Sequence, residues 1–223
     1  MRILYHWPLC GASRSVRLFL AEKKLDHTRI VEPYWKKREE FCELNPRAQV
    51  PVLVEESGLV VCYGPVICAY LEEAYPGPIS FFGHTPVTRA QTRSLCALLE
   101  GEFYADVIHK IVFEKTLKRH FGLGYLDSAK VREGTKALGD YLDYFSFLVG
   151  RRHWLAGEDY SLADMTAAGY LSCLDYLGHV PWEDYPEMKD WYARMKSRPS
   201  MRSLLEDRLP GLSPSQHYSD PDF

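Results

Sequence analysis

The first residues that could do chemistry are Cys10 and Ser13, in the run Cys10-Gly11-Ala12-Ser13 between a short apolar segment and the first helical pattern. A thiol or hydroxyl at a helix N-terminus lies at the positive end of the helix dipole, which lowers a cysteine pKa and favours the thiolate. Such a group could activate a thiol substrate or form a mixed disulfide with it. Residues at this position are also common turn formers and helix caps, so both interpretations stay open.

A second chemical signal is the pair Val50-Pro51, which opens the apolar run at 52–54. Proline is tolerated at the first residue of a strand, and X-Pro is the one peptide bond that can be cis at low cost. In a thioredoxin-like fold, a cis proline here would turn the backbone N–H and C=O of Val50 toward a pocket, where they could pair with a peptide-like thiol. An ordinary trans proline at the start of a strand fits the same residues.

A third pattern, Ser161-Leu162-Ala163-Asp164, is typical of a helix start. The spacing fits a capping box, in which Ser161 and Asp164 each accept a hydrogen bond from the other's backbone N–H. We expect a structural role without direct chemistry, and a loss of about 1–2 kcal/mol if the cap is removed.

The elements that must position these residues follow from periodicity. Residues 1–78 alternate strand and helix signals, which predicts β/α packing with some parallel strands. Later apolar residues recur at helical spacing. The predicted fold class is α/β plus all-α. It comprises a thioredoxin-like βαβαββα domain at 1–78, a linker at 79–86, a helical-bundle domain at 87–206 and an extended tail at 207–223. Within the first domain we expect strands at 3–6, 27–31, 52–54 and 59–61, and helices at 13–23 and from Pro65.

Composition excludes several classes of protein. The chain is 46% hydrophobic and 26% charged, and its formal charge of -3 gives no reason to expect a nucleic-acid partner. We find no apolar run of the roughly 18–20 residues that span a bilayer, and no signal peptide at the N-terminus. The six cysteines are scattered, without the spacing of a metal site or a disulfide framework. We therefore expect a cytoplasmic protein that holds no metal.

In combination and in this order, these motifs resemble the glutathione-transferase family over nearly the whole chain. The resemblance rests on the Cys/Ser run, VPVL at 50–53, ICAYLEEAYP at 67–76 and SLAD at 161–164. It implies that the backbone of Val50, before Pro51, pairs with the cysteinyl group of glutathione. It also implies that Cys10 or Ser13 is the activating side chain, and that the protein is a homodimer.

The sequence departs from the enzymes of that family just before the ICAYLEE helix. The enzymes carry an acidic residue and then a serine that hold the glutamyl end of glutathione, whereas this chain has Tyr63 and Gly64, followed by Pro65. The Gly64 N–H could still bind a carboxylate. Charge-assisted hydrogen bonds of this kind contribute about 1.5–3 kcal/mol, so their loss weakens glutathione binding roughly tenfold to a hundredfold. We expect a vestigial glutathione site, no required cofactor and no catalysis.

Stretches in both domains, and most specifically the tail, resemble the glutathione-transferase-like proteins of alphaproteobacteria that bind polymers of the tubulin homologue FtsZ. The similar stretches lie at 32–41, 174–186, 191–199, 207–212 and 217–223. The resemblance implies FtsZ as partner and a location at the bacterial division site. Aromatic and acidic groups can anchor such a partner, and a homodimer would present two tails. The candidate contact residues are Trp35, His217, Tyr218, Asp220, Asp222 and Phe223.

Each of these contact predictions has an alternative. The tail could pack back on its own helical domain, and Trp35 could be a partly covered loop aromatic. For the whole protein three hypotheses follow: a non-catalytic FtsZ-binding protein that promotes constriction, a glutathione transferase or thiol-transferase that uses Cys10 or Ser13 on an electrophile or disulfide, and an adaptor for another protein.

Overall fold

The computed structural model describes residues 1–220. Its N-terminal domain is built on a four-stranded sheet with the strand order β2-β1-β3-β4. The strand β1 runs parallel to β2 and antiparallel to β3, and β3 and β4 form the predicted hairpin. The elements of this domain are β1 (Ile3–His6), α1 (Gly11–Glu22), β2 (Thr28–Val31), η1 (Tyr34–Lys36), α2 (Glu39–Leu44), β3 (Val52–Val54), β4 (Val60–Cys62) and α3 (Gly64–Ala74).

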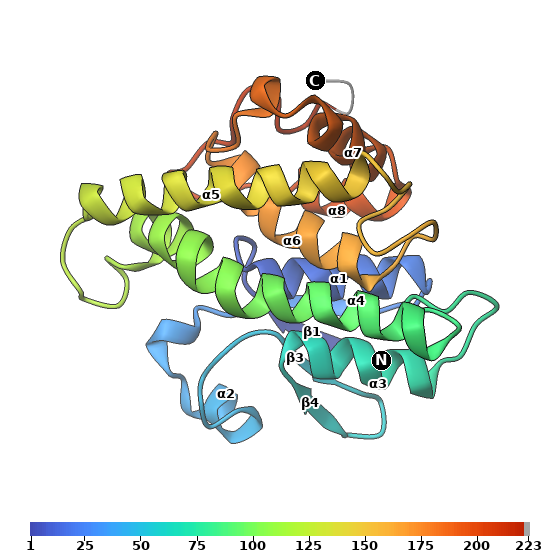
Figure 1. Ribbon diagram of the computed structural model, residues 1–223. Coiled ribbons are helices and arrows are strands. Elements are labelled where there is room, and N and C mark those ends of the chain that lie inside the picture. Colours follow the sequence, from blue (N-terminus) through green and yellow to red (C-terminus); the bar gives the residue numbers. More distant parts are fainter. Residues whose placement is uncertain (221–223) are drawn as a thin grey trace.

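The rest of the chain is helical, as predicted. Figure 1 shows α4 in green and α5 in yellow as long helices, with α6 beneath α5 and the C-terminal segment in red at the top of the molecule. The helix α6 is buried along its whole length, so it forms the centre of this domain. The elements are α4 (Pro86–Leu98), η2 (Leu99–Leu117), α5 (Ser128–Val149), α6 (Leu162–Tyr176), η3 (Trp182–Asp184), α7 (Pro186–Lys196), η4 (Pro199–Met201) and α8 (Arg202–Leu205). The domain boundaries at 78, 86 and 206 stay predictions.

Two glycines allow α1 and α6 to pack unusually closely. A Cβ atom at Gly11 would lie 2.1 Å from the ring of Tyr170, and one at Gly169 would lie 2.8 Å from the carbonyl oxygen of Gly11. Both distances are far below van der Waals contact, so glycine alone fits at these positions. The contact brings the first turn of α1, which follows Cys10, against the central helix of the second domain.

Some predicted boundaries were wrong by one or two residues. Helix α1 begins at Gly11 instead of Ser13 because the chain is already helical directly after its N-cap, Cys10. The second strand begins at Thr28 and the fourth covers Val60–Cys62. Helix ends fray and strand ends depend on the partner strand, so shifts of this size are expected.

The predicted capping box is present at the start of α6. The Ser161 N–H donates to the Asp164 carboxylate at 3.0 Å, and the Ser161 hydroxyl accepts from the Ala163 N–H at 3.3 Å. The same carboxylate also accepts from the Leu155 N–H and from the indole of Trp191, each at 3.0 Å. Asp164 therefore holds a loop and α7 as well as its own helix, which is more than the cap predicted from the sequence.

Within residues 1–220, no helix combines the length and the apolar character needed to cross a membrane. The same residues contain no cluster of His, Cys, Asp or Glu side chains that could hold a metal ion.

Candidate functional site

A cavity of about 370 Å³ lies between the two domains. Five of the six residues predicted for the glutathione site line it: Cys10, Val50, Pro51, Tyr63 and Gly64. The Val50–Pro51 peptide bond is cis. The Cys10 Sγ atom lies 3.9 Å from the carbonyl oxygen of Val50, so the thiol and this backbone group share one wall of the cavity.

The prediction of a lowered pKa for Cys10 was wrong. Burial raises the pKa of this thiol above its ordinary value, although the Ser13 side chain and the N–H groups of Ser13 and Ala12 at the start of α1 act in the opposite direction. The helix dipole that the sequence suggested is present, but the loss of solvent around the sulfur outweighs it. Cys10 is therefore a protonated thiol near neutral pH.

Ser13 does not lie in the cavity. Its side chain is fully buried, and its hydroxyl oxygen accepts from the Trp7 N–H at 3.5 Å. The serine is not among the residues that line the cavity. It supports the loop before α1, and its side chain lowers the pKa of the Cys10 thiol by less than burial raises it.

At Tyr63 and Gly64 the backbone is arranged as in a ligand site, but the side chains do not supply the acidic group or the hydroxyl that family enzymes have there. Tyr63 caps α3 with a φ of 70°, in the left-handed region that is rare for a tyrosine, and Gly64 begins the helix. A conformation of this kind persists where the surroundings hold it and is common at ligand sites. The N-terminus of α3 thus lies on the cavity, but neither residue supplies a carboxylate or a short hydroxyl.

The residues on the opposite wall of the cavity were not predicted from the sequence. Glu100, Tyr104, Ile108 and Val112 recur every four residues along η2 and face the cavity together, and Tyr170 of α6 joins them. Burial raises the pKa of Glu100 to about 7. The spacing of four could have indicated a shared face, since residues i and i+4 are neighbours on a helix. The sequence gives no sign, however, that this face turns toward Cys10.

Trp35 lies in an aromatic cluster beside the cavity. Its ring stacks on His120 with centroids 4.7 Å apart and meets the edge of Trp7 at 4.6 Å. Phe121, from the same loop as His120, lies 6.5 Å away and is 38% exposed. Trp35 is itself half-buried, which agrees with the alternative of a partly covered aromatic, and it joins η1 to the loop after η2.

The described part of the tail packs back on the helical domain. Tyr218 is fully buried, its hydroxyl donates to the Leu204 carbonyl at 2.8 Å, and its ring meets Tyr176. A ring nitrogen of His217 lies 2.8 Å from the Asp175 carboxylate. In this arrangement Tyr218 is an internal anchor, which agrees with the alternative that the tail packs back on its own helical domain.

Asp220 lies at the surface end of this anchored segment. Lys196 donates to the backbone carbonyls of His217 and Asp220 at 2.8 Å and 2.9 Å. Asp220 is exposed. The candidate contact residues Asp222 and Phe223 lie outside the described residues.

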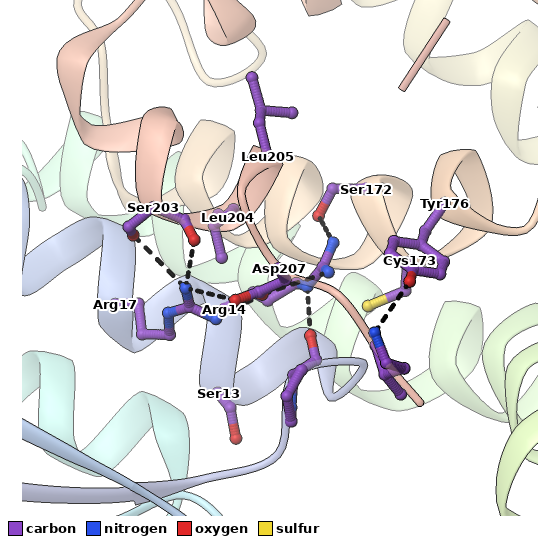
Figure 2. A network of polar contacts seen from close by, with 12 residues as sticks. Ser13, Arg14, Arg17, Ser172, Cys173, Tyr176, Ser203, Leu204, Leu205 and Asp207 are labelled. Atoms are coloured by element: carbon purple, nitrogen blue, oxygen red, sulfur yellow. Dashed lines mark hydrogen bonds and ion pairs between the residues drawn. The ribbon is translucent and has the colours of Figure 1, made fainter. Parts of the chain in front are cut away.

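A buried ionic network connects the end of α8 to α1 (Figure 2). The Asp207 carboxylate accepts from two nitrogens of the Arg17 guanidinium, at 2.6 Å and 3.0 Å, and approaches Arg14 at 3.5 Å. Arg14 also donates to the Ser172 hydroxyl of α6, and Arg17 to the Ser203 carbonyl. The C-terminal segment is therefore fastened to the same helix whose N-cap is Cys10.

Comparisons with known sequences agree with this geometry. Family models match at two places, the glutathione S-transferase N-terminal domain at residues 9–74 and the C-terminal domain at residues 104–199. The chain is 43% identical to FtsZ-localized protein A of Caulobacter vibrioides, over 100% of this chain and 98% of that protein. It is 30% identical to Glutathione S-transferase 2 of Saccharomyces cerevisiae, over 92% of this chain and 90% of that protein.

Solved structures are similar to this chain over the same length. A glutathione S-transferase from Rhodospirillum rubrum superposes with a TM-score of 0.95 at 46% identity, with 100% of both chains covered. The structure of FzlA from C. crescentus superposes with a TM-score of 0.96 at 43% identity, over 100% of this chain and 99% of that one. The predicted resemblance is confirmed over both domains, and this chain belongs to the glutathione S-transferase family.

Proposed function

We propose that this protein is a non-catalytic member of its family that binds FtsZ polymers and promotes constriction at the division site of a bacterial cell. The observation that carries the proposal is the 43% identity to FtsZ-localized protein A, which extends over 100% of this chain and so includes the tail. Other relatives, such as the yeast transferase, match 92% of the chain.

The chemistry of the cavity supports a role outside catalysis. The thiol of Cys10 is protonated near neutral pH because burial raises its pKa, and the Ser13 hydroxyl lies away from the cavity. Among the described residues, the side chains that line the cavity include no lysine, arginine or histidine to hold the carboxylates of glutathione. We infer that the cavity neither activates glutathione nor holds it tightly.

The anchoring of Tyr218 changes how the tail would act. With Tyr218 held inside the protein, the residues that remain to contact FtsZ are those after it, Asp220 to Phe223, together with the cluster around Trp35. A homodimer would carry two such ends, and two weak contacts to one polymer bind much more tightly than one, through effective concentration. We propose a bivalent contact of this kind.

Co-sedimentation with FtsZ polymers tests the proposal. Removing residues 217–223 would also remove Tyr218, so the sharper variant ends at Asp220 and keeps the internal anchor. We expect the wild type to pellet with FtsZ polymers, and both the shortened chain and Trp35→Ala to pellet at least several-fold less. Exposed Asp159 provides a control, Asp159→Ala, which leaves pelleting unchanged. Equal pelleting of the wild type with and without FtsZ polymers contradicts the proposal.

A second function, that of a glutathione transferase or thiol-transferase, is favoured by one observation. The cavity still places the Cys10 thiol and the Val50 carbonyl on one wall, 3.9 Å apart. This function requires retention on immobilised glutathione and a conjugation or disulfide-exchange rate that falls in Cys10→Ala. Turnover by the wild type that is lost in this variant would replace the first proposal with the second.

A further inference from the structure

The polar side chains on the cavity wall are acidic or neutral. They comprise a carboxyl, a thiol, phenols and one amide, whereas no side chain on the wall within residues 1–220 carries a positive charge. Apolar residues, proline and glycine supply the rest of the wall. The polar lining residues are Glu100, Cys10, Gln49, Tyr34, Tyr63, Tyr104 and Tyr170.

Among the residues that the structure describes, Glu100 supplies the one carboxyl group on this wall. Within residues 1–220 no lysine, arginine or histidine pairs with it, and its pKa rises to about 7 through burial alone. A carboxylate that is desolvated without a partner is costly, and a positively charged ligand removes that cost. The position of Glu100 on the cavity means that such a ligand can reach it from solvent.

The aromatic groups around Glu100 suit the same ligand. Tyr34, Tyr104 and Tyr170 line the cavity from η1, η2 and α6, and within the described chain their hydroxyls make no hydrogen bond to protein. Aromatic ring faces attract ammonium groups, most strongly where water is excluded. Their apolar edges also provide contact area for a hydrocarbon body.

From this arrangement we propose that the cavity binds an organic cation, an amine or quaternary ammonium group on an apolar body, with its charge at Glu100 and its body against the aromatic wall. The volume of about 370 Å³ lies within the range of small-molecule sites. Glutathione, with two carboxylates and one ammonium group, is a poor match for a wall without cations. This site is independent of FtsZ binding, so either proposal can fail alone.

The pH dependence of cation binding reports on the ionisation of Glu100. Tyr63 faces the cavity as well as Glu100. Six further titratable groups that face the cavity or are coupled to Glu100 have raised pKa values, and they stay neutral near pH 7. These groups are Cys10, Tyr34, Cys68, Cys96, Tyr104 and Tyr170. Since Glu100 ionises as the pH rises through about 7, affinity for a cation should increase between pH 6 and pH 8.

Calorimetric titration with three matched probes tests the proposal: 4-phenylbutylamine, 4-phenylbutanol and 4-phenylbutyrate, each at pH 8. We expect the amine to bind roughly tenfold to a hundredfold more tightly than the alcohol, with the acid weakest. Glu100→Gln should remove the preference for the amine. Glu102→Gln, on the exposed side of the same helix, should keep it. Thermal unfolding verifies that both variants are folded.

Three results overturn the proposal. The first is that the alcohol or the acid binds as tightly as the amine. The second is that Glu100→Gln folds and still binds the amine more tightly than the alcohol. An amine affinity of the wild type that is the same at pH 6 and pH 8 counts equally against the proposal. The third is that none of the probes binds at millimolar concentration. FtsZ co-sedimentation of Glu100→Gln should match that of the wild type whatever the titrations give.

Discussion

The network around Asp207 gives a prediction with a defined magnitude. The side chains of Arg14 and Arg17 are 0% and 1% exposed, and Asp207, at 12%, is the carboxylate between them. The change Asp207→Ala leaves two buried guanidinium groups without a counter-charge. Breaking a buried ion pair by removing one partner costs about 3–5 kcal/mol, a large part of the roughly 5–15 kcal/mol of a typical domain.

Urea denaturation followed by tryptophan fluorescence measures this loss. With a slope of about 2–3 kcal/mol per molar, the midpoint should fall by roughly 1–2 M in Asp207→Ala. The control Asp159→Ala removes an exposed carboxylate and should shift the free energy of unfolding by less than about 0.5 kcal/mol. The C-terminal segment should also become more sensitive to protease, because Asp207 fastens it to α1.

The result that refutes this reasoning is a loss below about 1 kcal/mol in Asp207→Ala, with the slope of the denaturation curve unchanged. Such a result would mean that the two arginines find other partners or solvent when the carboxylate is absent. In that case the network around Asp207 would not hold the C-terminal segment on α1.

Three further predictions concern single groups. Tyr218→Phe removes a buried hydroxyl that donates to Leu204 at 2.8 Å and should lower the free energy of unfolding by about 1–2 kcal/mol; no change in the urea midpoint would argue against the anchor. Iodoacetamide should label Cys10 slowly at pH 7 and quickly only in alkali, because burial raises the pKa of the thiol; fast labelling at pH 7, seen by mass spectrometry, would indicate a thiolate. Burial raises the pKa of Glu22, but hydrogen bonds from Arg198 and Ser200 more than offset this and lower it below its ordinary value. The carboxylate therefore stabilises the fold at pH values above that ordinary pKa, and the difference in stability between wild type and Glu22→Gln should vanish as the pH falls through the lowered pKa. A difference in stability that does not depend on pH would contradict this.

The features that the sequence predicts well are local. The capping box depends on two side chains three residues apart, and the β3–β4 hairpin depends on two short apolar runs around a turn. The Val50–Pro51 pair marks the cavity wall through its own backbone. Each of these signals depends on residues that are close together in the sequence. It can therefore be recognised without knowing how distant segments pack.

The features that the sequence does not predict depend on packing between distant segments. The pKa of Cys10 is raised by desolvation in the packed protein, and the close contact of α1 with α6 depends on Gly11 and Gly169, which are far apart in the sequence. Glu100 belongs to the site because η2 turns that face toward the first domain. The aromatic and acidic pattern of the tail suits an exposed binding segment and an internal anchor equally, and the burial of Tyr218 decides between them.

One hint of the ionic network around Asp207 was present in the sequence. Arg14 and Arg17 lie among buried residues of α1, and two buried arginines require a carboxylate partner. The sequence alone does not say that Asp207 supplies it.

The central claim is that the family's pocket no longer serves glutathione and that the function lies in binding a polymer. One purified sample, divided between glutathione resin with a conjugation assay and a spin-down assay with assembled FtsZ, tests it most directly. We predict no retention on the resin, no conjugation above background and clear recovery with the FtsZ pellet. Conjugation at the rate of an ordinary transferase, with all of the protein left in the supernatant, would contradict the account.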